Sequence, residues 1–261
     1  IGNIAEFVFY VNMLTWPVSS LGWVTAIVQR AAASQKRINE FLNTNTEIKS
    51  GEIGAFVFRE EIELKNVSFQ YPDSGIMALK DISVKLTKGK VIGVTGATGS
   101  GKTSLAQLLL RIYNPDSGSI EADGINIKDL NLQEYRKQFG YVPQDVFLFS
   151  DSIKNNIALA NESSIDDDQI IESARKAAVY DNIMEFEHQF ETTIGERGIT
   201  LSGGQKQRIS IARALAKDPA ILIFDDCLSA VDATTEKEIL YELKQVIKDK
   251  TALIISHRVS S

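Results

Sequence analysis

The residues with the clearest chemical potential form a glycine-rich run, GATGSGKT, at positions 96–103. The run fits the pattern G-x-x-x-x-G-K-[ST] and lies between a short apolar stretch and a segment with helical leucine spacing. Glycines let backbone amides turn toward phosphate oxygens, and the start of a helix adds positive potential. Lys102 would reach the β- and γ-phosphates, and the Thr103 hydroxyl would ligate Mg²⁺. The candidate phosphate-binding residues are Gly96, Ala97, Thr98, Gly99, Ser100, Gly101, Lys102, Thr103 and Ser104.

Two carboxylates stand at the end of a second apolar run, ILIFDD, at 221–226. Because parallel strands bind ligands at their carboxyl ends, Asp225 is placed to hold Mg²⁺ through water. Asp226 follows it and could polarise the attacking water molecule. The alternative is a strand that simply ends in acids. Together with the glycine-rich run, the pair predicts a Mg²⁺-dependent mononucleotide site.

The elements that must position these residues read as an α/β fold. Short apolar runs at 91–94, 141–142, 221–224 and 252–255 are typical of buried parallel strands. A further strand is expected at 62–71, with a bulge near Asn66, and a helix at 166–178. Strands that alternate with helices predict a sheet covered by helices.

Composition narrows the class of protein. The chain has 261 residues, with 34 acidic and 28 basic side chains, and a formal charge of −6. This balance argues against a general nucleic-acid binder, and the 44% of hydrophobic residues argue against a disordered chain. The single cysteine, Cys227, is expected to be a packing residue.

Residues 7–29 contain no charged side chain. As a helix they would extend about 34 Å, enough for a bilayer core of about 30 Å. A secretory signal is not supported, because no basic segment precedes the run. A buried helix of a soluble protein remains as the alternative to a membrane span. Pro17 is expected to kink or locally break the helix. Bases after the run, from Arg30 to Arg37, indicate the cytoplasmic side.

The chain resembles the ATP-binding-cassette (ABC) family through LSGGQ at 201–205, the family signature. Tyr71 matches the aromatic residue that stacks on adenine. Gln144 matches the glutamine that senses Mg²⁺ and the γ-phosphate. SAVD at 229–232 matches the loop that crosses to the partner, and His257 matches the switch histidine. The resemblance covers residues 60–261 and implies a P-loop fold with a β-rich and a helical subdomain.

TTIGERG at 192–198 and RAAASQKRINEFL at 30–42 are similar to segments of ABC exporters. The resemblance implies a last transmembrane helix at 1–30 and a cytosolic extension and linker at 31–59. A nucleotide-binding domain is expected at 60–261, with its helical subdomain near 145–210. It also implies five further membrane helices before residue 1 and a domain truncated at its C-terminus.

The resemblance implies ATP and Mg²⁺ as ligands and a head-to-tail dimer of nucleotide domains as the active form. ATP on one chain would be capped by the signature of the other. The protein would lie in the cell (inner) membrane with its nucleotide domain in the cytoplasm, and would bind no nucleic acid. The implied residues are Asp226, His257 and Gln144 for catalysis, Thr103, Gln144 and Asp225 for the metal, and Tyr71, Ser202, Gly203, Gly204 and Gln205 for the nucleotide.

Asp226 departs from the family pattern, which usually has Glu at this position. Asp is one methylene shorter, so the chain's own site is expected to be slow, as in one half of a heterodimeric exporter. A soluble ABC ATPase of DNA repair or translation and a non-hydrolysing regulatory half are the remaining alternatives. The transported substrate cannot be inferred from these residues.

Overall fold

The computed structural model describes residues 2–159, 165–195, 201–227, 233–248 and 250–256. The chain forms two compact units, Ile1–Glu47 and Ile48–Ser261. The first contains one long helix, and the second contains every strand and the remaining described helices.

Helix α1 spans Gly2–Leu42 and continues through Pro17. The expected local break at Pro17 is therefore not found, because a proline removes only one donor from a helix that many other bonds hold. The hydroxyls of Thr15, Ser20 and Thr25 donate to backbone carbonyls three or four residues earlier, at 2.7 to 2.9 Å. These bonds satisfy polar side chains inside the helix itself, as an apolar environment demands.

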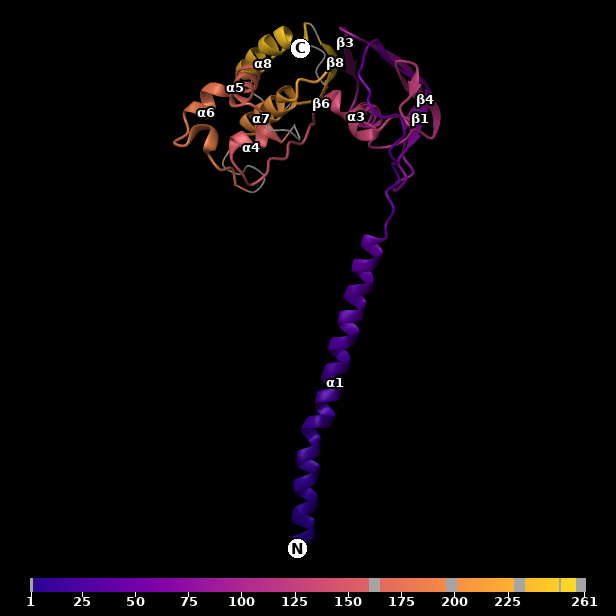
Figure 1. Ribbon diagram of the computed structural model, residues 1–261, viewed down its shortest axis with the longest axis vertical. Coiled ribbons are helices and arrows are strands. Elements are labelled where there is room, and N and C mark those ends of the chain that lie inside the picture. Colours follow the sequence, from indigo (N-terminus) through magenta and orange to yellow (C-terminus); the bar gives the residue numbers. More distant parts are fainter. Residues whose placement is uncertain (1, 160–164, 196–200, 228–232, 249, 257–261) are drawn as a thin grey trace. The chain divides into compact units, whose positions relative to one another are not determined.

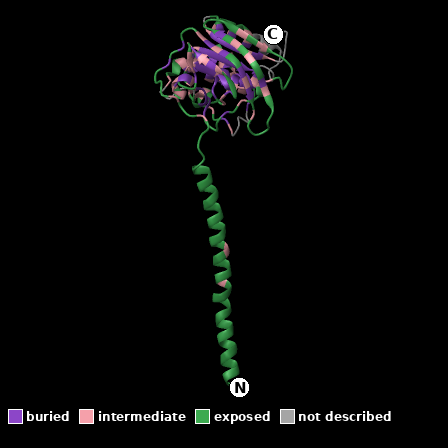
Figure 2. Cartoon of the chain, turned by 90° about the vertical axis from the view of Figure 1, so that its right-hand side faces the viewer, coloured by how far each residue is buried: buried purple, intermediate pink, exposed green. Residues whose placement is uncertain are grey.

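Among the described residues, α1 is the only helix that is long and apolar enough to cross a membrane by length and composition. Within its own unit, large apolar side chains such as Phe7, Trp16 and Trp23 are exposed, and Figure 2 shows α1 exposed along nearly its whole length. A helix that is apolar on every side needs lipid or neighbouring helices to cover it.

The second unit contains two four-stranded sheets. The antiparallel sheet has the order β2-β1-β4-β5 and consists of β1 (Glu61–Gln70), β2 (Met77–Thr87), β4 (Ser117–Ala122) and β5 (Ile125–Asn126). The parallel sheet has the order β3-β8-β7-β6 and consists of β3 (Val91–Thr95), β6 (Phe139–Val142), β7 (Ile221–Asp225) and β8 (Thr251–Ser256). The second sheet confirms the four short strands predicted from apolar runs.

Helices lie on both sides of the parallel sheet (Figure 1). In chain order they are α2 (Lys102–Leu109), α3 (Leu132–Lys137), α4 (Ile153–Ala158), α5 (Asp167–Lys176), α6 (Tyr180–Met184), the 3₁₀ helix η1 (Gln189–Glu191), α7 (Gly203–Ala216) and α8 (Ala233–Ile247). Helix α5 confirms the helix predicted at 166–178.

The parallel sheet separates two hydrophobic clusters. Ile221 and Ile223 of β7 face the cluster that contains β1, α2 and α3, whereas Leu222 and Phe224 face the cluster that contains α4, α5 and α7. Alternation along one strand therefore joins a β-rich lobe to a helical lobe. Strand β7, which ends in Asp225, contributes side chains to both clusters.

The compact unit begins earlier than the predicted domain start at residue 60. Phe56 and Phe58 are buried in the β-rich lobe. The amides of Gly51 and Ile53 donate to the carbonyls of Leu130 and Asp129, both at 3.0 Å. Two aromatic side chains in a polar stretch thus anchor much of the segment that the sequence indicates as linker.

Two local predictions are confirmed. Strand β1 shifts register between Leu64 and Val67, and Asn66 has a φ of 49°, so a bulge lies where the sequence predicts one. Cys227 is buried, and burial raises the pKa of its thiol to about 12. The thiol therefore stays protonated at neutral pH and acts as a small packing residue.

Candidate nucleotide site

The glycine-rich loop connects β3 to α2 and depends on left-handed glycines. Gly99 has a φ of 79° and Gly101 a φ of 87°. Gly101 is the N-cap of α2, and a Cβ at this position would overlap the carbonyl oxygen of Ala78. Only glycine combines this backbone conformation with such close contact. The loop is thus held against β2 while the amino end of α2 faces it.

Lys102 is buried and folds back over its own loop. Its Nζ donates to the carbonyl oxygens of Gly96 at 2.9 Å and Ala97 at 2.8 Å, and to Ser100 Oγ at 3.4 Å. These acceptors satisfy a buried cation without any ligand. A phosphate group could replace them with charge-assisted contacts, which are stronger.

Asp225, at the carboxyl end of β7, links the loop to the neighbouring strands. The Thr103 hydroxyl donates to its Oδ1 at 3.2 Å, and the Tyr141 hydroxyl donates to its Oδ2 at 3.3 Å. Asp225 is only 1% exposed, so these partners matter for a buried carboxylate. Burial and the Asp225 charge raise the pKa of Tyr141 above its ordinary value, and Tyr141 therefore remains a donor.

This pair of oxygen groups fits Mg²⁺. The ion prefers hard oxygen ligands and usually takes few protein side chains, with phosphates and water completing the shell. Thr103 Oγ1 and Asp225 Oδ1 already lie within one hydrogen bond of each other. Within the described ranges no group of three or more His, Cys, Asp or Glu residues could hold a metal. Bound Mg²⁺ would neutralise phosphate charge.

Asp226 and Gln144 lie near the same sheet edge. Asp226 directly follows β7, is nearly buried, has a φ of 47°, and its amide donates to the Ile255 carbonyl at 2.9 Å. Gln144 is exposed and follows β6, the parallel neighbour of β7. The topology therefore places the glycine-rich loop, Gln144 and Asp226 at the carboxyl ends of β3, β6 and β7, respectively.

Tyr71 lies at the end of β1 and connects to the phosphate-loop helix. Its hydroxyl donates to Gln107 Oε1 at 2.9 Å and shares a hydrogen bond with Ser104 Oγ at 2.8 Å. Its ring packs edge-on against Phe69 and Tyr113, with centroids 5.0 and 5.6 Å apart. Ser104 thus contacts the expected adenine platform.

Tyr71→Ala is expected to weaken ATP binding by roughly five- to hundredfold, because stacking on a base contributes about 1–3 kcal/mol. Tyr71→Phe and Tyr71→Trp keep a flat face and should bind ATP nearly as well as wild type. Calorimetric titration of ATP into the three variants checks this. Equal losses in all three would show that stacking is the wrong mechanism.

The signature residues form the start of α7. Ser202 is the N-cap, and its Oγ accepts from the Gln205 amide at 3.2 Å. The Ser202 amide donates to Gln205 Oε1 at 2.9 Å, which completes a capping box. Gln205 therefore has a structural role in the described chain. The Ser202 hydroxyl proton and the amides of Gly203 and Gly204 lie at the positive end of the helix.

Some expected residues lie outside the described ranges: His257, the loop 229–232 and residues 196–198 of the exporter-like segment. Tyr141 and Gln107 contact site residues although the sequence reasoning missed them. A tyrosine near the end of a buried strand beside ILIFDD is the signal that could have indicated Tyr141.

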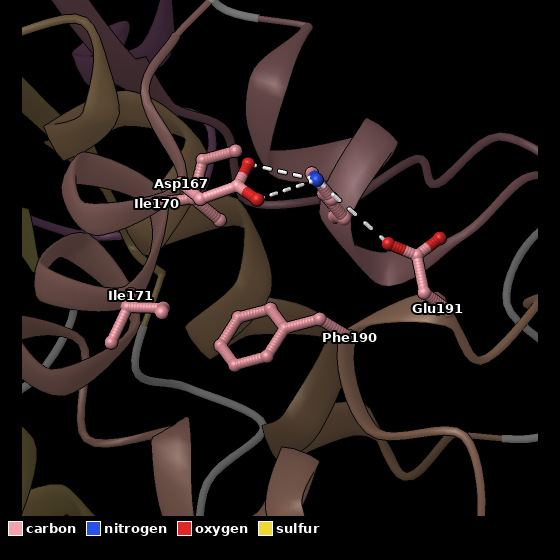
Figure 3. Close-up of a pocket in the computed structure, with 6 residues that line it drawn as sticks. Asp167, Ile170, Ile171, Phe190 and Glu191 are labelled. Atoms are coloured by element: carbon pink, nitrogen blue, oxygen red, sulfur yellow. Dashed lines mark hydrogen bonds and ion pairs between the residues drawn. The ribbon is translucent and has the colours of Figure 1, made fainter.

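A separate pocket of about 180 Å³ lies in the helical lobe between α4, α5 and η1. Lys154 pairs there with Asp167 at 2.8 Å and Glu191 at 3.9 Å, and Ile170, Ile171 and Phe190 complete the lining (Figure 3). Its one basic and two acidic side chains form ion pairs with one another. None of the predicted nucleotide residues lines the pocket. The pocket is therefore not the nucleotide site.

A parallel sheet with a glycine loop between β3 and α2, and an aspartate at the end of β7, defines a P-loop nucleotide-binding fold. The sequence profile described as ABC transporter matches residues 79–229. The chain belongs to the ABC transporter family.

Its relatives match all or nearly all of the chain. The multidrug resistance-like ATP-binding protein MdlA of Escherichia coli (strain K12) is 38% identical over 100% of this chain and 44% of its own. The ATP-dependent lipid A-core flippase of Aliivibrio fischeri is 41% identical over 94% of this chain and 42% of its own. The structure of a bacterial Atm1-family ABC exporter with ATP bound is similar, with 34% identity and a TM-score of 0.82 over 96% of this chain and 44% of that chain. The chain thus spans less than half the length of these relatives.

Proposed function

We propose that this chain supplies the ATP-binding and ATP-hydrolysing part of an ABC exporter, together with one of its membrane helices. The observation that carries the proposal is the contact between Thr103 and Asp225 beside the glycine-rich loop. It brings together the two side chains that we propose to hold Mg²⁺ in a P-loop site. The similarity to exporters extends through the segment of α1, which favours an exporter over a soluble ATPase.

In this proposal, ATP binds with its phosphates on residues 96–103 and its adenine on Tyr71. Lys102 leaves the Gly96 and Ala97 carbonyls to contact the phosphates. Asp226 accepts the proton of the attacking water, and Gln144 and His257 orient the γ-phosphate end. A second nucleotide domain caps the ATP with its own Ser202, Gly203 and Gly204, so closure of the dimer depends on ATP.

We place the nucleotide domain in the cytoplasm and α1 in the cell membrane. The basic residues after the uncharged run support this orientation. The names of the relatives cover lipid A-core and multidrug export, so the substrate class stays open among exported compounds.

The short side chain of Asp226 favours a second candidate, in which this chain is the slow half of a heterodimeric exporter. Asp tolerates φ values near 47° better than Glu does, and its carboxylate reaches about 1.5 Å less far. A misplacement near 1 Å can slow a reaction about a hundredfold. The intact signature would still complete the partner's faster site.

The full-length transporter reconstituted in lipid is expected to hydrolyse ATP only with Mg²⁺, and chelation with EDTA should reduce the rate to background. Phosphate release measured with and without EDTA tests this. Mg²⁺-independent hydrolysis would contradict the assignment of Thr103 and Asp225. A complete lack of hydrolysis with ATP bound would favour a regulatory half.

A further inference from the structure

Both oxygens of the Asp225 carboxylate accept hydrogen bonds, and the two bonds come from different elements. The Thr103 hydroxyl of α2 donates to Oδ1 at 3.2 Å, and the Tyr141 hydroxyl of β6 donates to Oδ2 at 3.3 Å. The last torsion of an aspartate side chain has a broad energy profile, so the partners of its oxygens decide the plane of the carboxylate. Thr103 and Tyr141 therefore help to fix the orientation of the buried Asp225.

The pairing of β6 with β7 explains why Tyr141 reaches this carboxylate. In the parallel register Tyr141 lies opposite Ile223, two positions before Asp225. Ile223 and Tyr141 pack in the same hydrophobic cluster, the one that contains α2. Two strand positions correspond to about 6.6 Å, so only a long side chain that ends in a donor can bridge them. Phenylalanine would fill the same space but could not donate a hydrogen bond.

Mg²⁺ and Ca²⁺ make different demands on a carboxylate. Mg²⁺ requires near-ideal octahedral geometry and keeps several waters, whereas Ca²⁺ takes about six to eight oxygens and accepts a carboxylate through one oxygen or both. The hydrogen bond from Tyr141 to Oδ2 opposes the use of both Asp225 oxygens by one ion, and Oδ1 lies beside the Thr103 hydroxyl. This arrangement suits an ion that needs a single carboxylate oxygen.

We propose that Tyr141 is a positioning residue of the metal site, which makes Asp225 act through Oδ1 alone and thereby favours Mg²⁺ over Ca²⁺ as the ion that accompanies ATP. Tyr141 touches neither the ion nor the nucleotide and acts through Asp225. The inference rests on the proposed function, in which Thr103 and Asp225 hold Mg²⁺. Its rival is a purely structural role, in which the hydroxyl only satisfies a buried carboxylate.

Tyr141→Phe in the full-length transporter tests the proposal, because it removes one hydroxyl and keeps the ring. Calorimetry with the Mg²⁺ and Ca²⁺ complexes of the β,γ-imido analogue of ATP, which is not hydrolysed, gives the Kd of each complex. We expect the ratio of the Ca²⁺ Kd to the Mg²⁺ Kd to fall about tenfold, the usual cost of losing a hydrogen-bond partner of a metal-holding side chain. An unchanged ratio would overturn the proposal.

Tyr135→Phe is the matched control. Tyr135 is fully buried, and its hydroxyl donates to the Leu109 carbonyl at 2.8 Å, at the end of α2 away from the glycine-rich loop. The variant therefore also removes one buried tyrosine hydroxyl from the same lobe, but it leaves Asp225 untouched. Its Kd ratio should equal that of wild type. An equal fall in the ratio in both variants would show a general loosening of the lobe and would contradict the proposal.

A double-variant cycle with Asp225→Asn separates the possible failures. If Tyr141 acts through Asp225, then Tyr141→Phe should change the Kd ratio by less than about twofold in the Asp225→Asn background. Independent, multiplying effects in the double variant would overturn the positioning role. An Asp225→Asn variant with the wild-type dependence on Mg²⁺ would instead contradict the proposed function, because Asp225 would then hold no ion.

Binding of the same analogue in EDTA distinguishes positioning from folding. Without metal, Tyr141→Phe and wild type should have the same Kd, since Tyr141 donates to Asp225 and not to the glycine-rich loop. Tyr141→Met, which is also long and apolar but has no donor, serves as a second variant with the same expectations. Equal losses of affinity with Mg²⁺, with Ca²⁺ and in EDTA in both variants would show that the hydroxyl only supports the fold.

Discussion

Replacing Lys102 with alanine is expected to lower the ATP affinity of the chain roughly ten- to hundredfold, since a hydrogen bond to a charged group contributes about 1.5–3 kcal/mol. Lys102 is the side-chain cation of the glycine-rich loop, and its Nζ lies on the Gly96 and Ala97 carbonyls, where phosphate would replace them. Isothermal titration calorimetry of the full-length transporter with Mg-ATP measures the change.

The control for this experiment is Lys80→Ala, which removes an exposed lysine of β2 and leaves the loop intact. Both variants should melt at similar temperatures, because the hydrogen bonds of the Lys102 side chain to Gly96, Ala97 and Ser100 all lie within its own loop. Equal ATP affinity in wild type and Lys102→Ala would place the nucleotide site elsewhere.

Asp226→Asn is expected to lower the rate of ATP hydrolysis by about 10²–10⁴-fold, the usual contribution of a general base. ATP affinity should change little, because Asn has nearly the same size and tolerates the left-handed φ of 47°. Single-turnover phosphate release from the purified transporter measures the rate. A rate close to wild type would remove Asp226 from the mechanism.

Asp226→Glu distinguishes an ordinary ATP-hydrolysing site from the slow half of a heterodimeric exporter. If the short side chain limits this site, a longer carboxylate should raise turnover despite the conformational cost of Glu at this backbone position. Unchanged or lower turnover, together with an inactive Asp226→Asn, would show that Asp226 is already a competent base. The slow-half candidate would then be wrong.

Much of the nucleotide lobe follows from sequence because its signals are local. The glycine-rich loop, the apolar runs of the parallel strands and the bulge at Asn66 each depend on neighbouring residues, and the structure has them all. The proximity of Thr103 and Asp225, the side chains proposed to hold Mg²⁺, was also predictable, since each stands at the end of a buried strand or loop with a known geometry.

Contacts between distant segments were not predictable in the same way. The bond from Tyr141 to Asp225 joins residues 84 positions apart, and it depends on the pairing of β6 with β7, which neither segment encodes by itself. Phe56 and Phe58 bury in a core that forms only when the antiparallel sheet closes, so the segment before residue 60 read as linker. The local break considered at Pro17 was wrong, because helix α1 continues through this residue from Gly2 to Leu42.

The signature residues 201–205 match two patterns, a helix cap and a nucleotide contact implied by the family resemblance. Ser202 and Gln205 match a helix-capping box, and the structure has both of its hydrogen bonds. The family resemblance assigns the same residues to the nucleotide of a partner chain. The two roles are compatible for Ser202, whose hydroxyl accepts from the Gln205 amide and still carries a proton to donate.

The central claim is that ATP on one chain is completed by the signature of a second nucleotide domain. Sedimentation velocity of the compact unit 48–261 carrying Asp226→Asn, with folding checked by circular dichroism, tests it most directly. The account predicts monomers without nucleotide, dimers with saturating Mg-ATP, and monomers again when Lys102→Ala is added. A unit that binds ATP by calorimetry yet stays monomeric at every ATP concentration would contradict the composite site.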